Sequence, residues 1–274
     1  MQPDLSDLTH AYLQPDGLER LLRFLQASLQ IAVSLLVSPP VLYDTLLLSS
    51  VLNNNNHLHQ PLAELSGRLG LVRRFLRFFR FLDAFSASYN VFTSPSKDGQ
   101  PTSAYLEKTM EGLAGTFNGL YLLLEAVTLV DALRIPGLAV WGTELESVLK
   151  VESQRCWLFA LVAGALACML RLSRLQDHTP ARTVPDKVTQ KGTTIDEKEN
   201  VKMEKERSQS SLKSAQGRRL TRKMVACVLD MALPGSVIGW IPASRSSVAI
   251  IMLVTSVLTG LDVWERCGKE VGKQ

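Results

Sequence analysis

The stretch LGLVRRFLRFFRFLDAFSASY, Leu69 to Tyr89, is the most informative part of this sequence. At the helical spacing of about 100° per residue, its large apolar side chains fall on one face and its arginines on the opposite face. Five of the nine phenylalanines of the chain lie between Phe75 and Phe85, and Asp83 is the single acidic residue. A helix that packs in a soluble protein usually mixes Glu with Lys on its wet face. The arginine-rich pattern therefore favours a helix lying in a membrane–water interface.

The two faces of this helix predict two roles. Burial of one large apolar side chain in the acyl boundary contributes roughly 1.5–3 kcal/mol, and each basic residue near an anionic surface contributes on the order of 1 kcal/mol. The apolar face should therefore dominate, with charge selecting an anionic phospholipid membrane. We predict membrane insertion by Phe75, Phe78, Phe79, Leu82 and Phe85. We predict binding of lipid headgroups by Arg73, Arg74, Arg77 and Arg80.

Three other interpretations of the stretch stay open. A helix sealed in a protein core can carry the same apolar face. A helix that binds in the groove of a calmodulin-type partner has a similar pattern. An arm that binds nucleic acid would carry Lys and Arg without so wide an aromatic face, so we expect no nucleic acid as a partner.

The rest of the chain predicts a mainly α fold with amphipathic and membrane-associated helices, because strand-type alternation is nearly absent. A first amphipathic helix is expected from Asp16 to the prolines at 39–40, with leucines on one face and Arg20 and Arg23 on the opposite face. The apolar segment 113–140 contains three charged residues, so we expect it to pack on protein rather than span a bilayer. Its Gly115 and Gly119 would let another helix approach closely.

Two uncharged stretches are candidates for membrane-spanning helices: Cys156 to Leu170, and Ser246 to Leu261. Each is shorter than the about 20 residues that a span usually needs, but flanking arginines and tryptophans can extend their reach. We predict a membrane helix over 246–263 and a candidate span over 155–172. If both cross the membrane, residues 171–245 form one basic loop, which the positive-inside rule places in the cytosol.

Composition divides the chain into four zones. The stretch 176–217 is polar and charge-rich, and it lacks the large apolar residues that a core requires, so it is predicted to be a disordered charged linker before the C-terminal apolar helix. The predicted zones are an N-terminal amphipathic helical region (1–60), the basic amphipathic helix with apolar helices (61–175), this linker (176–217), and the C-terminal region with its membrane helix (218–274).

The chemistry of the chain predicts neither an enzyme nor a metalloprotein. Its 274 residues are 46% hydrophobic and 20% charged, with a net charge of +4. No nucleophile elbow, zincin motif, P-loop or Rossmann fingerprint occurs. The four cysteines are too sparse and scattered for a disulfide scaffold, and they form no CxxC pair that could bind zinc. His57 and His59 are expected in a solvated loop. We therefore expect no catalytic residue, no metal site and no cofactor.

The order of these parts, with RRFLRFFRFLDAF at 73–85, resembles the peroxisomal biogenesis factor 11 family. The resemblance implies an integral protein of the peroxisomal membrane whose basic amphipathic helix enters the cytosolic leaflet and starts tubulation. It implies elongation, division and proliferation of peroxisomes, self-association into a homo-oligomer, and recruitment of dynamin-related fission machinery. It also implies recognition by an import receptor for peroxisomal membrane proteins, for which 73–82 and 218–225 are candidate signals.

Two rival functions stay open at this stage. A membrane pore or transporter for small metabolites would use Glu125, Asp131 and Arg134 to line a polar path. A soluble helical adaptor would place the basic helix in the groove of a partner protein.

Overall fold

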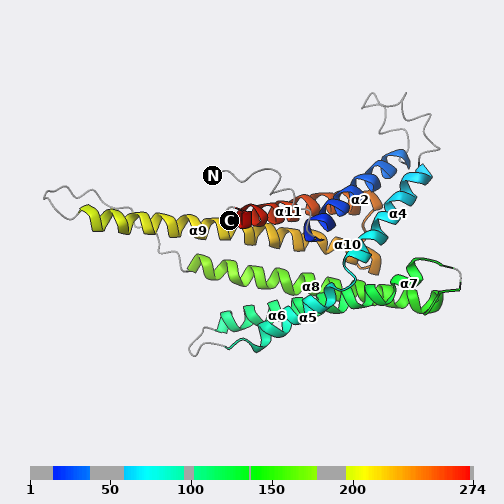
Figure 1. Ribbon diagram of the computed structural model, residues 1–274, viewed down its shortest axis with the longest axis horizontal. Helices are drawn as coiled ribbons and strands as arrows, with labels where there is room; N and C mark the ends of the chain where they lie inside the picture. Colours follow the sequence, from blue (N-terminus) through cyan, green and yellow to red (C-terminus); the bar gives the residue numbers. More distant parts are fainter. Residues whose placement is uncertain (1–14, 38–58, 96–101, 136, 178–195, 272–274) are drawn as a thin grey trace, which may run out of the picture.

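The computed structural model describes residues 15–37, 59–95, 102–135, 137–177 and 196–271 (Figure 1). Every regular element in these ranges is helical, which confirms the predicted mainly α class. In chain order the helices are α2 (Pro15–Val37), α4 (His59–Leu76), α5 (Arg80–Thr93), α6 (Thr102–Val127), α7 (Leu129–Ala132), α8 (Gly142–Asp177), α9 (Asp196–Asp230), α10 (Ala232–Ile238) and α11 (Arg245–Val271).

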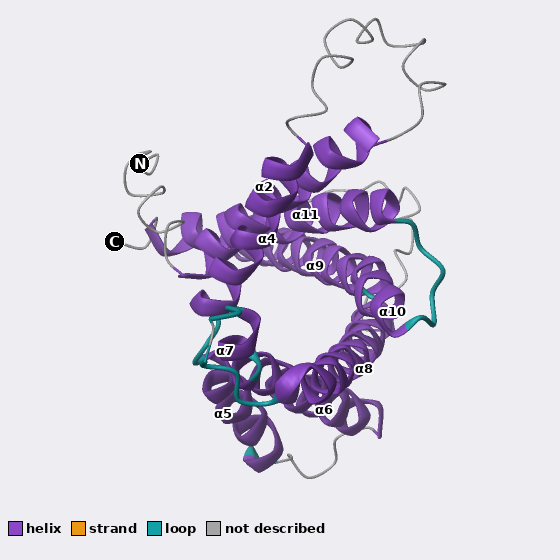
Figure 2. Ribbon diagram, turned by 90° about the vertical axis from the view of Figure 1, so that its right-hand side faces the viewer, coloured by secondary structure: helices purple, strands orange, loops and turns teal. Residues whose placement is uncertain are grey.

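The helices form two groups joined by the long helix α9. In one group α6 packs between α5 and α8, and in the other α2 packs between α4 and α11. Helix α9 packs on both α8 and α11. Viewed along the long axis, the helices are arranged around a central space (Figure 2).

The basic aromatic stretch is bent instead of forming one straight helix. Helix α4 ends at Leu76 and α5 begins at Arg80. Across the turn between them, the backbone N–H groups of Arg77 and Arg80 donate to the carbonyls three residues earlier, the tighter 3₁₀ spacing that commonly marks a bend. The first predicted helix, by contrast, is continuous: α2 begins within a residue of Asp16 and ends before the prolines.

Two helices are long and apolar enough to cross a membrane: α8 over Gly142–Gln176 and α11 over Arg245–Glu265. They contain the predicted spans and run in the same direction, because α9 returns the chain antiparallel between them (Figure 1). Trp157, near the middle of α8, packs against the buried cluster formed by Ala27 of α2, Leu233 of α10 and Met252 of α11. This differs from the single loop that is expected over 171–245 if both helices cross the membrane. The stretch contains α9, which runs antiparallel between α8 and α11 (Figure 1).

The structure also differs from the sequence prediction over part of the linker. Residues 196–217, expected to be disordered, form the first part of α9, whereas 178–195 lie outside the described residues. The stretch is too polar to build a core, but it is rich in Glu and Lys, which are good helix formers. A polar composition excluded burial here without excluding a helix. The predicted domain boundaries stay a prediction.

The helices α5 and α6 meet along a row of glycines. A Cβ atom built on Gly119 would lie 2.7 Å from the ring of Phe85, and one on Gly115 would meet the hydroxyl of Ser88. A Cβ on Gly112 would likewise overlap the ring of Phe92. The sequence prediction that this glycine pattern admits a second helix is therefore confirmed, and the second helix is α5.

Replacing Gly119→Ala should destabilise the protein by about 1–3 kcal/mol, because the added methyl overlaps the Phe85 ring in a packed contact. The measurement is thermal unfolding of the full chain in detergent micelles. Gly67→Ala is the control, since a Cβ there meets nothing within 4 Å and alanine stabilises a helix by about 0.5–1 kcal/mol over glycine. Equal melting of Gly119→Ala and the wild type would refute this packing.

Candidate functional site

The arginines of the basic stretch point into the protein. Arg73 is buried and donates two hydrogen bonds to Glu19 Oε1 on α2, at 2.7 and 3.2 Å, and one to Gln26 Oε1 at 2.7 Å. Arg77 donates to Glu125 Oε1 on α6 at 2.9 Å, and its guanidinium lies 5.9 Å from the ring centre of Tyr121. These hydrogen bonds join α4 to α2, and the turn after α4 to α6.

Arg74 is held in the same region. It donates to the carbonyl oxygen of Glu125 at 2.9 Å and to the hydroxyl of Thr128 at 2.8 Å. Arg80 is half-buried and lines the same interior. Headgroup binding by these four predicted arginines stays a prediction. For Arg73, Arg74 and Arg77 it would require exchange of the bonds they make to protein groups in this structure.

The apolar side chains of the stretch divide into two sets. Phe75, Phe79 and Leu82 are 51%, 69% and 56% exposed. Phe78 and Phe85 are half-buried: the ring of Phe78 makes an edge-on contact with that of Phe79, and Phe85 packs on Gly119. Membrane insertion stays a prediction for all five, and the structure leaves the first three as the outward face.

In helix α2, too, charged residues are buried while large apolar residues are exposed. Leu21, Phe24 and Leu25 are exposed, whereas Glu19 and Arg23 are buried. Arg23 belongs to the polar face opposite the leucines, and the structure turns that polar face inward.

Arg23 connects α2 to two further helices through its side chain. It forms a buried ion pair with Asp230 of α9 and donates to the hydroxyl of Thr255 on α11 at 3.1 Å.

More Arg–carboxylate pairs join the remaining helices. Arg171 of α8 donates to Glu107 of α6 at 2.8 Å, and Arg174 lies 2.9 Å from the second oxygen of Glu107. Between α9 and α11, Arg219 donates to Asp262 at 2.9 Å and Arg222 to Glu265 at 2.7 Å. Each of these pairs joins two different helices, so the network fixes how the helices are placed relative to one another.

The network changes the proton affinity of its buried groups. Burial alone would raise the pKa of the Glu19 carboxyl, but the neighbouring guanidinium groups of Arg20, Arg73 and Arg77 outweigh burial and lower this pKa to about 2. Burial raises the pKa of the Tyr121 phenol to about 12. Both groups therefore keep one protonation state at neutral pH: Glu19 is charged and Tyr121 is neutral.

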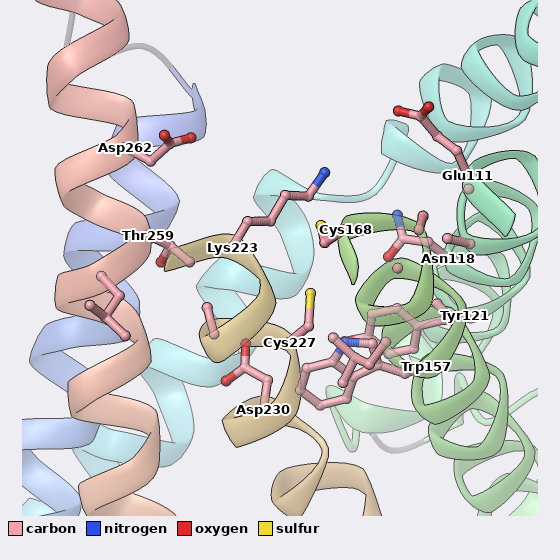
Figure 3. A pocket seen from close by; sticks show the side chains of 18 of the residues that line it. Glu111, Asn118, Tyr121, Trp157, Cys168, Lys223, Cys227, Asp230, Thr259 and Asp262 are labelled. Atoms are coloured by element: carbon pink, nitrogen blue, oxygen red, sulfur yellow. The ribbon is translucent and has the colours of Figure 1, made fainter. Parts of the chain in front are cut away.

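A cavity of about 720 Å³ lies among these charged helices, lined by residues of α2, α4, α5, α6, α8, α9, α10 and α11 (Figure 3). The stacked rings of Tyr121 and Trp157, 5.3 Å apart, form part of its wall. Lys223, Cys227 and Asp230 of α9 face it. The lining is thus partly aromatic and partly charged, which suits a ligand of mixed character.

The three residues expected to line a polar path do not line this cavity. Glu125 is bound to Arg77. Asp131 is buried and accepts hydrogen bonds from the backbone N–H groups of Val140 and Trp141, at 2.8 and 3.1 Å. Arg134 is exposed in the loop after α7. The pore hypothesis in that form gains no support from the geometry.

No group of three or more potential metal ligands occurs in the part of the chain that the structure describes. His57 lies outside that part.

Most of the carboxylates of the network were not predicted from the sequence: Glu19, Glu107, Asp230, Asp262 and Glu265. The sequence did contain a feature that indicates such carboxylates. An arginine-rich helix face and isolated acids within apolar helices are each costly alone, so they are expected to pair. Spacing along the sequence could not say which acid meets which arginine.

A family model described as peroxisomal biogenesis factor 11 matches residues 5–264 of the chain. No curated protein and no solved structure shows a significant match.

Replacing Glu19→Gln should destabilise the protein at pH 7 by about 3 kcal/mol, because it leaves buried guanidinium groups without their carboxylate. A carboxyl whose pKa is lowered on folding stabilises the fold fully above its unfolded value, near 4.5, and loses this contribution as pH falls toward about 2. The difference in unfolding free energy between wild type and variant should therefore be complete at pH 6 and shrink between pH 4.5 and 2.

Chemical denaturation of the full chain in micelles across this pH range measures the difference. The matched control is Glu64→Gln, because Glu64 pairs with Arg68 on the exposed surface of α4 and such pairs contribute 0–1 kcal/mol. A Glu19→Gln variant as stable as the control at pH 6 would contradict the assigned role of Glu19.

Proposed function

Because the chain belongs to the peroxisomal biogenesis factor 11 family, we propose that it remodels the peroxisomal membrane by inserting the outward apolar face of α4 and α5 into one leaflet. Family membership makes it a peroxisome-associated protein with a role in peroxisome biogenesis. The observation that supports the mechanism is the exposure of Phe75, Phe79 and Leu82 in a stretch whose Arg73, Arg74 and Arg77 face inward.

The exposed face can act as a wedge. Three large apolar side chains, each contributing roughly 1.5–3 kcal/mol on burial, favour seating α4 and α5 in the acyl boundary. Insertion into one leaflet enlarges that leaflet only, and the bilayer curves toward it. The bend at 77–79 allows the two helices to follow a curved surface together.

Integral placement in the membrane is the second part of the proposal. Only 28% of the apolar window of α8, and 28% of that of α11, is buried inside the protein, whereas the core helix of a soluble protein is mostly buried. The exposed side chains of α11 recur every three or four residues: Ile250, Val254, Val257, Leu261 and Trp264. On α8 the same spacing is kept by Phe159, Val162, Leu166 and Met169. Such stripes fit lipid chains or a second copy of the chain.

Self-association along these stripes would concentrate the wedges and amplify curvature. Recruitment of dynamin-related fission machinery and recognition by an import receptor stay predictions. The soluble adaptor would require partners to cover both stripes as well as the aromatic face.

Replacing Phe75, Phe79 and Leu82 together by Glu should abolish tubulation of anionic liposomes by the full chain, because carboxylates cannot enter the acyl region. Electron microscopy of proteoliposomes measures tubule formation. The matched control is Phe75→Leu, Phe79→Leu and Leu82→Ile, which keeps the face apolar and should keep at least half of the tubulation. Equal tubulation by the Glu variant and the wild type would overturn the wedge.

Alkaline carbonate extraction of cells expressing the full chain should leave the protein in the membrane pellet, because two apolar helices hold it there. Replacing Val254 and Val257 by Lys should release a large fraction, since charge within a span costs about 2.5–3.5 kcal/mol per residue. Lys substitutions at Ser86 and Asn90, exposed polar positions of α5, serve as the control. Release of the wild-type protein would favour the soluble adaptor.

A further inference from the structure

The loop between α7 and α8 presents large apolar side chains to its surroundings. Ile135, Leu138, Val140 and Trp141 are all exposed, Val140 by 64%. The segment 135–143 contains no charged residue. Exposed apolar residues gathered in one place usually mark a surface that contacts a membrane or another protein. The loop is therefore a candidate contact surface separate from the outward side chains of α4 and α5.

Three hydrogen-bond donors of this loop are bonded within the protein. Asp131, which is buried, accepts hydrogen bonds from the backbone N–H groups of Val140 and Trp141, at 2.8 and 3.1 Å. The indole Nε1–H group of Trp141 donates to the carbonyl oxygen of Val127 at 3.1 Å. A donor that enters the acyl region of a bilayer must be bonded to protein, because no water is available there. These donors meet that condition, so the end of the loop can leave water without breaking their hydrogen bonds.

The place of the loop in the fold favours a bilayer over a partner protein. The loop ends at Trp141, the residue before α8, which is one of the two helices long and apolar enough to cross a membrane. Tryptophan at such a position commonly lies at the membrane–water interface. The loop also adjoins the basic stretch 69–89: Arg74 donates to the hydroxyl of Thr128, next to the Val127 carbonyl that accepts from Trp141. The loop and the α4–α5 bend are therefore neighbours in the fold.

We propose that the loop 135–141 is a second membrane-inserting element, whose Leu138 and Val140 enter the acyl boundary of the leaflet that receives α4 and α5. Asp131 is a positioning residue: it does not contact lipid, but it holds the backbone of the two residues that precede α8. The proposal rests on the proposed membrane placement of the chain, but not on insertion of the three outward side chains of the α4–α5 bend. Two insertions at neighbouring points of one leaflet enlarge that leaflet more than a single insertion.

The test uses the full chain in liposomes of phosphatidylcholine and phosphatidylserine that contain a phosphatidylcholine with a photoreactive diazirine in its acyl chain. After illumination, peptide mass spectrometry identifies the residues that carry lipid, and we expect labelling within both 135–141 and 75–82. Leu138→Ser combined with Val140→Ser should lower labelling of the loop about five-fold, because burial of these two side chains drives its insertion, and should leave labelling of 75–82 unchanged. Leu212→Ser, at an exposed apolar position of α9, is the matched control and should change neither.

Variants of Asp131 test its positioning role. Asp131→Ala should lower labelling of the loop, because the backbone N–H groups of Val140 and Trp141 lose their acceptor. Asp131→Asn should keep most of the labelling, because its amide oxygen still accepts hydrogen bonds. The melting temperatures of both variants show whether they fold. If Asp131→Ala does not fold, the double Ser variant decides, since Leu138 and Val140 are exposed and their loss leaves the core intact.

The outcomes separate this proposal from the wedge. Labelling of 75–82 without labelling of 135–141 overturns the second insertion and leaves the wedge intact. Labelling of the loop alone supports the second insertion and contradicts the wedge. Loop labelling that the double Ser variant leaves unaltered overturns the proposal, and so does cross-linking of the loop to a second copy or another protein in place of lipid.

Discussion

The pairing of arginine with carboxylate inside the helical bundle is the constraint on which the rest of the structure depends. A buried carboxylate such as Glu19 is tolerated only with cations around it, and Arg73 reaches it from a helix distant in sequence. The pair of Arg23 with Asp230 likewise joins α2 to α9. Since these bonds fix which face of each helix turns inward, they also fix which face turns outward. The exposed apolar stripes are therefore a consequence of where the charges are satisfied.

This arrangement suits a bundle surrounded by lipid. In water, many exposed Leu, Val and Phe side chains would favour aggregation, whereas in a bilayer the same side chains are in a favourable solvent and the charges need protein partners. Helix α9 illustrates the point. It runs between two apolar helices, and Arg219, Arg222 and Asp230 of its C-terminal part are paired with residues of neighbouring helices. Pairing is what makes a polar helix compatible with apolar neighbours.

The sequence predicted the class of the fold, but it did not predict which face of each helix turns inward. Helical periodicity predicted α2, uncharged apolar runs predicted the central parts of α8 and α11, and the glycine spacing predicted the close contact of α6 with a second helix. Periodicity separates two faces but does not say which one is interior. That choice depends on acids far away in sequence, such as Glu125 for Arg77. The helical conformation of 196–217 does not follow from its composition, because a low content of apolar residues excludes a core but not a helix.

A comparison of two interaction free energies indicates how the stretch 69–89 would contact a membrane. Breaking the buried pair of Arg73 with Glu19 leaves an uncompensated charge, at a cost of about 3–5 kcal/mol. Contact of an arginine with an anionic surface contributes a favourable free energy of only on the order of 1 kcal/mol. At neutral pH Glu19 stays ionised, so this exchange is unfavourable, and the arginines are more stable in the protein. Insertion of Phe75, Phe79 and Leu82 needs no such exchange, because these side chains already face outward. In the proposed mechanism the free energy of insertion would therefore come from the aromatic and leucine side chains, and the arginines would hold the helix pair in the orientation that presents them.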